Sequence, residues 1–504
     1  VVRAPNNNVK RNWLLGLAVA GPAVVLLCVA PAPTVAQDAA QTKANPVRPT
    51  IPPPPPGPSG PVPRAPDGKP DLSGIWNGQR GLPNQEPPSM LPWAKALVDK
   101  RALTNYSDDL EARCMPGGPP RSAPYHYQIV QTPQLVLVLF EGNIHSYRQY
   151  FVNSDHPTNL KPTWYGDSRA RWEGDTLVVD TVGLNDKSWL DMPGHPHTDQ
   201  MHVIERFRRR DFGNLEIQNI VEDPGAYTKP WVTNRVSTLE TAIEMSEYVC
   251  NENNLDPEHL DFAPTNKSAS PENKNVTRTG VNPPPAKRAP GAPSGPTPRM
   301  PGGKVDFSGV WVLAGSPNLP SDPGYQPAAL KIYQERKANP SLDPERYCLP
   351  DGVARVNALP YKFVQTPTLL TVLPEGNTRA FRRIFLDGRD HSKQLDPGDS
   401  WTGDPTGSWD GDTLVVDIAG VNDKSWLDAT GRPHSEQLHA VERYRRPDLG
   451  HMRVDYTLED PRAYTKPYSF SRNFTLAQGL ELEEYICQEQ LTGPYPSHRS
   501  QAPQ

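Results

Sequence analysis

The chain carries one long series of motifs twice, and this duplication restricts the folds open to it. The run GDTLVVD from Gly174 to Asp180 recurs unchanged from Gly411 to Asp417, and Asn185–Asp191 (NDKSWLD) recurs as Asn422–Asp428. The period of about 235 residues far exceeds the ~20–50 residues of solenoid repeats. The sequence therefore predicts two tandem domains, and residues kept in both copies are the first candidates for a site.

The N-terminal segment has the layout of a secretory signal peptide. Lys10 and Arg11 precede an apolar run from Leu14 to Ala30, and small or short residues follow at Thr34–Ala36. The alternative is a retained membrane anchor, but Gly21–Pro22 in the middle of the run favours cleavage. We expect residues 1–36 to be a signal peptide and the protein to be periplasmic or extracellular.

Proline marks the connectors between the domains. The 61 prolines concentrate in Thr50–Pro66 and in the polar stretch Asn251–Pro301, which are compositions typical of extended or disordered chain. The predicted organisation runs from a signal peptide to a C-terminal tail in six parts: 1–36 signal peptide, 37–66 tether, 67–254 first domain, 255–300 disordered linker, 301–490 second domain and 491–504 tail.

Four cysteines lie outside the signal segment, two in each copy at matching places. Four cysteines allow three pairings, and the symmetry of the copies favours Cys114–Cys250 and Cys348–Cys487. One bridge would then close each domain, as is common in exported proteins. The wide separation of the cysteines within each copy argues against a zinc site.

Strand patterns dominate each copy. One helix is expected at Pro92–Asn105 and again at Pro327–Asn339, each with proline in its first turn. Short β-rich runs joined by turns such as Glu173–Asp175 predict an antiparallel meander that closes into a barrel. The expected strands are Tyr127–Thr132, Leu135–Phe140, Ser146–Val152, Arg169–Trp172, Thr176–Val182, His202–Arg208 and Leu215–Val221, then Tyr361–Thr366, Leu369–Leu373, Ala380–Leu386, Gly407–Trp409, Thr413–Ile418, His439–Arg445 and Met452–Leu458.

Each copy opens on a Gly-x-Trp motif, at Gly74–Trp76 and Gly309–Trp311, that resembles the start of lipocalin-type barrels. The resemblance implies an all-β fold of two lipocalin-like barrels, in each of which an arginine stacks on the tryptophan. The candidates for that arginine are Arg206 and Arg443, or Arg148 and Arg382. The helix and the Pro-rich excursion after the first strand depart from the lipocalin pattern.

The whole of each copy also resembles a family of uncharacterised secreted proteins from soil bacteria. The shared marks are the Cys-x-Pro segment, the Val-Gln-Thr-Pro strand, GDTLVVD, Trp-Leu-Asp, the segment Pro-His-Ser/Thr-Asp/Glu, and Asp-Pro-x-Ala-Tyr-Thr-Lys-Pro. This resemblance implies export and brings no activity with it.

A polar cluster between two expected strands is the best candidate for a site, because barrel mouths admit ligands. A histidine near a carboxylate is the minimal acid–base pair. The candidate catalytic residues are His197, His434, Asp186, Asp423, Glu205 and Glu442. Two histidines with a carboxylate also suit Zn or Fe, but the His-x4-His spacing of His197 and His202 matches no familiar site, so we expect no metal and no cofactor.

Structural roles compete with catalysis at these positions. Asp186 and Asp191 are ordinary turn residues, and His197 could simply hold its loop together. Trp164 and Trp189 recur as Trp401 and Trp426 in loops beside Gly and Asp. There, the rings either contact a ligand or cover the end of the barrel as a hydrophobic plug. The predicted ligand-binding residues are Trp164, Trp189, Trp401, Trp426, Asp191 and Asp428.

Three functions fit these features. The first is a secreted or periplasmic binding protein for a small apolar or glycosidic ligand. The second is a lyase, isomerase or hydrolase that uses a His–carboxylate pair at the barrel mouth, and the third is a surface interaction scaffold. The net charge of −5 excludes a basic surface for nucleic acid, so we expect a small molecule or glycan as partner and membrane contact only through the signal segment.

Overall fold

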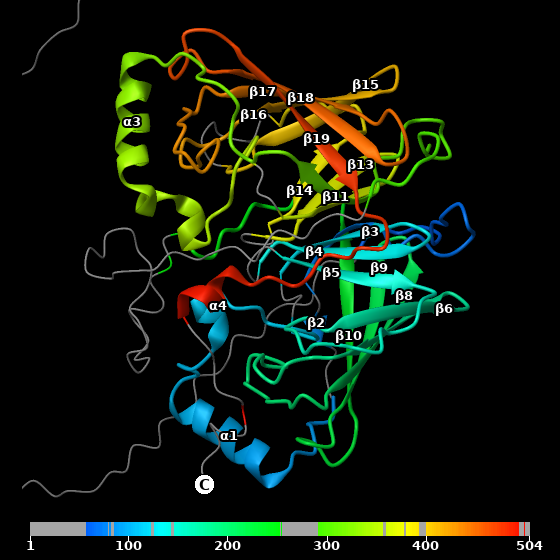
Figure 1. The fold of residues 1–504 in the computed structure, drawn as a ribbon. Helices are drawn as coiled ribbons and strands as arrows, with labels where there is room; N and C mark the ends of the chain where they lie inside the picture. The colour runs from blue at the N-terminus through cyan, green and yellow to red at the C-terminus, as the bar shows by residue number, and fades with distance from the viewer. Residues whose placement is uncertain are drawn as a thin grey trace, which may run out of the picture. The chain divides into compact units, whose positions relative to one another are not determined.

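The computed structural model contains two β-barrels, one for each copy of the repeat (Figure 1). It describes residues 57–78, 80–81, 85–121, 125–142, 146–252, 254, 291–355, 359–376, 380–392, 400–492 and 498. These residues all belong to one compact unit, Pro54–Gln504. The expected signal peptide and the expected linker up to residue 290 lie outside the described residues.

The first β-barrel, barrel 1, is closed because its first strand pairs with a neighbour on each side. Strand β1 bonds to β3 on one side and to β10 on the other, and the short β2 extends the edge of β10. The strands are β1 (Gly74–Trp76), β2 (Arg80–Gly81), β3 (Tyr127–Gln131), β4 (Leu135–Phe140), β5 (Tyr147–Val152), β6 (Asp167–Glu173), β7 (Thr176–Val182), β8 (His202–Asp211), β9 (Asn214–Glu222) and β10 (Trp231–Glu240).

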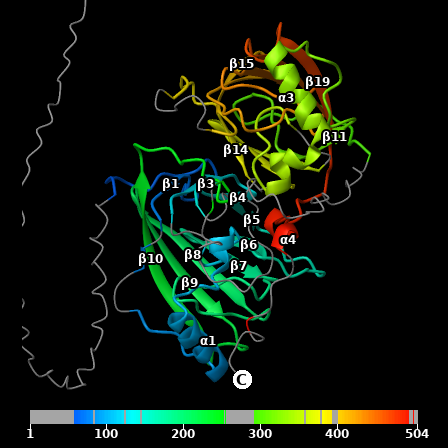
Figure 2. The ribbon, with the colours of Figure 1, turned by 90° about the vertical axis from the view of Figure 1, so that its left-hand side faces the viewer.

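The second barrel, barrel 2, repeats this order with nine strands (Figure 2). Closure removes the exposed strand edges, and the all-β class expected from the sequence is confirmed. Lipocalins close with eight strands, one fewer than here. The strands are β11 (Gly309–Ala314), β12 (Tyr361–Gln365), β13 (Leu369–Pro374), β14 (Arg382–Phe385), β15 (Asp404–Asp410), β16 (Thr413–Ala419), β17 (His439–Arg445), β18 (His451–Glu459) and β19 (Tyr468–Leu476).

One strand pair in each barrel breaks the expected antiparallel order. Strands β5 and β6 run parallel, with Tyr150 opposite Ser168, and β14 and β15 run parallel, with Phe385 opposite Thr406. A parallel pair needs a long crossover connection, which residues 153–166 supply in barrel 1. Short turns join most of the other neighbours, so the sequence pattern correctly predicted the antiparallel order of the remaining strands that it identified.

Both expected helices are confirmed. The last strand of each barrel, β10 or β19, was not expected from the sequence. Helices α1 (Pro92–Leu103) and α3 (Pro327–Ala338) both begin at a proline, and α4 (Cys487–Thr492) is new. Short 3-10 turns follow at η1 (Leu110–Arg113), η2 (Pro340–Leu342) and η3 (Pro344–Tyr347). In β10 and β19, arginine, asparagine and serine interrupt the apolar run, so neither strand stands out by hydrophobicity.

The tryptophan of each Gly-x-Trp motif is fully buried, and an arginine stacks on its ring. Arg209 Cζ lies 5.0 Å from the Trp76 ring centroid, and Arg446 Cζ lies 4.8 Å from that of Trp311. The four arginines proposed from the sequence for this role were therefore wrong. Arg206 and Arg443 point outward to Glu173 and Asp410, and Arg148 and Arg382 lie elsewhere inside the barrels.

The ends of both Pro-rich segments lie along the barrel that follows them. Arg64 forms a two-bonded ion pair with Asp175 at 2.6 and 2.7 Å, and Arg299 repeats it with Asp412 at 2.8 and 2.6 Å. Backbone bonds from Phe212 to Gly60 and from Leu449 to Gly295 continue the contact. The described parts of the expected tether and linker thus belong to the ordered structure.

Both expected disulfides are present. Cys114 bonds to Cys250 with an S–S distance of 2.09 Å, and Cys348 bonds to Cys487 at 2.03 Å. Each bridge ties the segment after the helix to the tail that follows the last strand. Closing loops of this length is worth roughly 4–5 kcal/mol in the chain-entropy model.

The two barrels have separate cores and also share a third hydrophobic cluster, which the sequence did not predict. Leu137 and Tyr147 of barrel 1 pack in the same cluster as Leu373 and Phe381 of barrel 2. Most residues of the cluster lie on β3, β4, β12 and β13, and the burial patterns of β4, β12 and β13 are almost continuous. Strands buried on both faces read as unbroken hydrophobic runs, which explains the lack of alternation there.

Each barrel's tail contacts the other barrel. The Glu484 carboxylate accepts bonds from the backbone N–H groups of Trp164 (2.6 Å) and Tyr165 (3.0 Å). In the matching place, Glu247 accepts from Trp401 N (2.8 Å) and from Ser400 Oγ (2.6 Å). Each tail thus supplies a glutamate to the matching loop of the other barrel, so the two copies contact each other in the same way.

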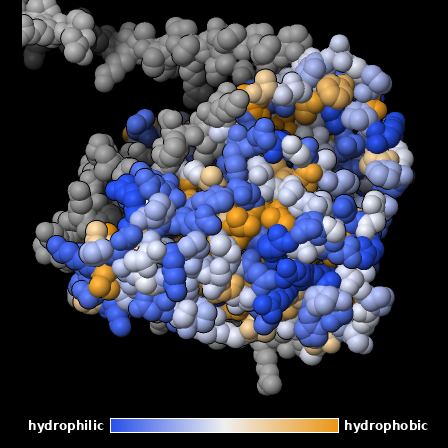
Figure 3. All heavy atoms as spheres, turned by 90° about the horizontal axis from the view of Figure 1, so that it is seen from above, coloured by the Kyte–Doolittle hydropathy of each residue, from blue (hydrophilic) through white to orange (hydrophobic). Residues whose placement is uncertain are grey.

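The surface is mixed in character. Figure 3 shows a face on which hydrophilic residues predominate around smaller hydrophobic patches. Within the part of the chain that the structure describes, no helix is long and apolar enough to cross a membrane.

Candidate ligand-binding site

His197 and His434 lie in the loops between β7 and β8 and between β16 and β17, and each pairs with a serine. His197 Nε2 lies 2.9 Å from Ser188 Oγ, and His434 Nε2 lies 2.8 Å from Ser425 Oγ. The Nδ1 atom of His197 lies 3.2 Å from the carbonyl oxygen of Thr198. Both ring nitrogens of His197 are therefore engaged, and neither meets a carboxylate.

These histidines are enclosed by protein. His197 is 0% exposed and His434 is 6% exposed. Burial lowers the pKa of His197 and lowers that of His434 to about 4, because an imidazolium would lose its hydration. A side chain on Gly118 or Gly352 would overlap Ser188 or Ser425, so the serine hydroxyls are tightly packed on that side.

Asp191 and Asp428 of the same loops form hydrogen bonds with nearby residues other than His197 and His434. Asp191 lies 2.7 Å from His195 Nδ1, which belongs to the same turn. Asp428 is fully buried and accepts bonds from the backbone N–H groups of Leu319 (2.9 Å) and Thr430 (3.0 Å). Asp186 is half-buried and Asp423 is exposed. The structure does not join any of these four carboxylates to His197 or His434 by a hydrogen bond.

The four loop tryptophans are buried next to cationic groups. Trp164 and Trp189 are each 2% exposed, as are Trp401 and Trp426. Arg101 Cζ lies 4.3 Å from the Trp189 ring centroid, a cation–π distance. The Trp401 Nε1–H group donates to Glu252 at 3.0 Å. The four rings are packed inside the protein, and the ligand-binding role expected for them stays a prediction.

Glu205 and Glu442 lie apart from the loops, inside the barrels. Because side chains alternate along a strand, these residues of β8 and β17 point inward. Glu205 pairs with Arg148 at 2.7 and 3.1 Å, and Glu442 pairs with Arg382 at 3.0 Å. Sequence reasoning placed Glu205 beside His197 because the two are close in the chain, and it missed the arginine partners on β5 and β14.

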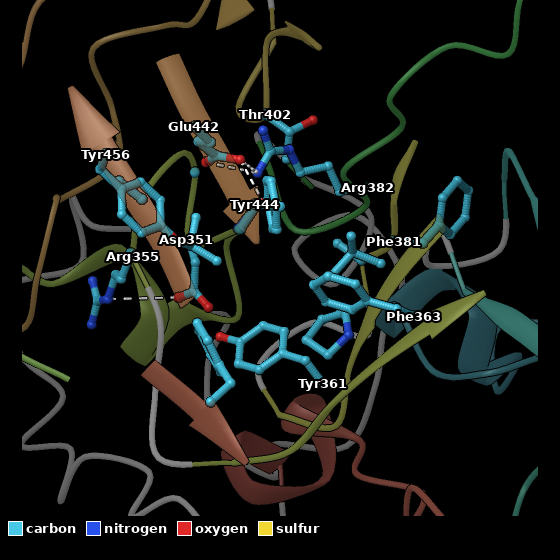
Figure 4. Close-up of a pocket in the computed structure, with 18 residues that line it drawn as sticks. Asp351, Arg355, Tyr361, Phe363, Phe381, Arg382, Thr402, Glu442, Tyr444 and Tyr456 are labelled. Atoms are coloured by element: carbon cyan, nitrogen blue, oxygen red, sulfur yellow. Dashed lines mark hydrogen bonds and ion pairs between the residues drawn. The ribbon is translucent and has the colours of Figure 1, made fainter. Parts of the chain in front are cut away.

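A cavity of about 90 Å³ opens into barrel 2 beside the Arg382–Glu442 pair (Figure 4). Its rim comes from the 350–355 loop and Thr402, and its wall comes from inward-facing residues of β12, β13, β14, β17, β18 and β19. Six aromatic side chains line it: Tyr361, Phe363, Phe381, Tyr444, Tyr456 and Phe474. Of the site residues predicted from sequence, only Glu442 lines this cavity.

The polar groups of the cavity form one network with the wall. Glu442 is 1% exposed, and its Oε2 accepts a 2.7 Å bond from the Tyr444 hydroxyl. Burial alone would lower the pKa of Arg382, but the Glu442 carboxylate outweighs this and raises it. Arg382 is therefore a fixed cation that is paired with Glu442 and borders a largely aromatic wall.

At the rim, Arg355 is fully occupied by acids. It bonds to both oxygens of Asp343 at 2.8 Å and also pairs with Glu345 and, at 3.7 Å, with Asp351. Arg121 repeats this arrangement in barrel 1 with Asp109 and Glu111. The rim arginines thus fix the loop, whereas Arg382 borders the cavity.

A second cluster of ionisable residues lies on the outer wall of each barrel and was missed from the sequence. In barrel 1, His156 and His202 both contact Asp180 Oδ1 at 3.1 Å through Nε2. Barrel 2 repeats it with His391, His439 and Asp417. Retention in both copies was the available signal. Among the described residues, no three His, Cys, Asp or Glu side chains are arranged to hold a metal ion.

Comparison with known proteins adds no family. No protein-family model matches the chain, and no curated protein matches it. Among solved structures, the chain is similar to the "crystal structure of a putative thioesterase II from Thermobifida fusca YX", with 11% identity over 55% of this chain and 74% of that chain. The TM-score of that match is 0.08, so it supports no argument about fold or activity.

Proposed function

We propose that the protein binds a small, largely apolar molecule inside barrel 2. The observation that carries the proposal is the cavity of about 90 Å³, which is lined by aromatic rings and has one buried ion pair in its wall. Ligand sites are typically concave and apolar with a few fixed polar groups. Because an apolar cavity of about 150 Å³ accommodates benzene, this smaller space suits a compound with only a few carbon atoms.

Binding is favoured over catalysis by the surroundings of the histidines. An acid–base catalyst must reach both its substrate and, in the expected scheme, a carboxylate. His197 and His434 are instead buried against Ser188 and Ser425, and the cavity lies at other residues. The glycosidic ligand expected from the loop tryptophans also has less support, because those rings are covered.

The proposed site of action is an oxidising compartment outside the cytoplasm. Two disulfides, one in each barrel, support this placement, since such bonds persist mainly in secreted or periplasmic proteins.

Filling the cavity with the residue that barrel 1 carries should abolish binding. Pro374 of β13 matches Phe140 of β4, which is buried in barrel 1. We expect 3-methyl-2-butanone and isobutyrate to bind the wild-type protein, as measured by isothermal titration calorimetry. In Pro374→Phe, binding should weaken at least tenfold, while the melting temperature stays the same or rises because the void is filled.

Val454→Ile, which copies Ile217 of barrel 1, is the milder version of the same test and should weaken binding less. An exposed change far from the cavity, Glu436→Ala, serves as the control and should leave binding unchanged. Binding that persists at full strength in Pro374→Phe would place the ligand elsewhere and refute the proposal.

A further inference from the structure

We infer that the ligand of barrel 2 is a carboxylic acid, held by Arg382 through its carboxylate and by the aromatic wall through a short apolar body. This inference rests on the proposed function and names the class of ligand. It follows from the donors that Arg382 leaves unused and from the contrast with the same arginine in barrel 1.

Arg382 uses only one edge of its guanidinium group. Its Nη1 donates to Glu442, whereas its Nε and Nη2 are buried without a hydrogen-bond partner. Buried donors left unsatisfied are costly. The Nε and Nη2 groups of one arginine lie side by side and match the two oxygens of a carboxylate, which they bind as a pair.

In barrel 1, hydroxyl groups satisfy Nη2 of the matching arginine, Arg148, whereas its Nε lacks a hydrogen-bond partner, as in barrel 2. Arg148 Nη2 donates to Glu205 at 2.7 Å and approaches the hydroxyls of Ser168 and Thr181 at 3.3 Å each. The Arg148 side chain is 3% exposed, and that of Arg382 is 16% exposed.

The strand register identifies what changed between the copies. Ser168 faces Thr181 across β6 and β7, and the matching pair across β15 and β16 is Pro405 and Ile418. Neither proline nor isoleucine offers a side-chain acceptor. Barrel 2 has thus lost the two hydroxyls that approach Nη2, and its cavity lies beside the same arginine.

The rest of the cavity defines the body of the acid. The aromatic rings and Val372 and Val454 carry no charge, and the two carboxylates of the lining, Glu442 and Asp351, are each paired with an arginine. The other arginine of the lining, Arg355, is already bound by three acids, so one carboxylate is the most that the site accepts. The limited volume points to a short branched or small cyclic acid.

The test compares isobutyrate with 3-methyl-2-butanone, which has nearly the same shape and carries a methyl group in place of one carboxylate oxygen. We expect isobutyrate to bind wild-type protein at least tenfold more tightly in calorimetric titrations at pH 7. In the variant Pro405→Ser/Ile418→Thr, the restored hydroxyls compete for Arg382. The preference for the acid should fall to threefold or less, while the ketone binds as before.

A second variant guards against misfolding of the first. Arg382→Met/Glu442→Gln removes both charges together, so no buried ion is left unpaired, and it should bind the ketone but show no preference for the acid. Equal binding of acid and ketone by the wild-type protein would overturn this inference and leave the proposed function standing. Failure of both probes to bind would overturn the proposed function, and the inference with it.

Discussion

The buried histidines make a residue-scale prediction about pH. The pKa of His434 is about 4 in the folded protein, whereas an unfolded histidine titrates near 6.5. As the pH falls below 6.5, the unfolded chain takes up a proton that the folded chain refuses, so the free energy of unfolding decreases between pH 6.5 and 4. The slope is about 1.4 kcal/mol per pH unit for each such histidine.

Chemical denaturation at several pH values measures this slope. His434→Gln, which keeps a group able to bond to Ser425, should make the slope between pH 6 and 4.5 shallower by about one proton. His451→Gln changes an exposed histidine and serves as the control. A slope in His434→Gln identical to that of the wild-type protein would show that His434 titrates normally.

At this same scale, the sequence indicated which residue types matter but not how they are grouped. His197 and Glu205 are close in the chain, yet one lies in a loop and the other points into the barrel. Arg148 and Glu205 are far apart in the chain and meet only because β5 and β8 face each other across the interior. Chain proximity is a poor guide to contacts in a barrel, because neighbours on a strand point to opposite faces.

At the scale of elements, the tails predict a measurable coupling between the barrels. The Glu484 carboxylate is bonded to the backbone N–H groups of Trp164 and Tyr165. In Glu484→Ala these buried donors lose their acceptor, which should cost about 1–3 kcal/mol of stability. Glu247→Ala should cost a similar amount in barrel 2, where burial raises the pKa of Glu247.

Thermal and chemical unfolding of the two tail variants check this prediction, with the exposed Glu436→Ala as the control. A loss below about 0.5 kcal/mol in both variants, the usual effect of a surface change, would mean that the tails do not stabilise the contact.

Most elements were predictable because their pattern is local. Turns such as Glu173–Asp175 and the proline at the start of each helix mark boundaries within a few residues of the chain. The parallel pairs depend on a crossover whose path the sequence does not specify. Strand β19 was also missed, although Tyr468, Phe470 and Phe474 keep the two-residue spacing of an inward face.

At the scale of the whole molecule, duplication has produced two barrels with one framework and different interiors. The disulfides, the Trp–Arg pairs and the Ser–His pairs recur in both copies. One difference lies next to Arg382, where Pro405 and Ile418 replace Ser168 and Thr181. Positions shared by both copies therefore describe the framework, and the proposed site depends on a shared arginine, Arg382, whose neighbours differ between the copies.

The most direct test of this account is a methyl NMR titration of the full chain with isobutyrate. The account predicts that the methyl signals of Val372 and Val454, which line the cavity, shift in proportion to occupancy. The signals of Val138 and Ile217, their counterparts in barrel 1, should stay unchanged. Shifts confined to barrel 1, or no shift in either barrel at saturating isobutyrate, would contradict the claim that barrel 2 is the binding domain.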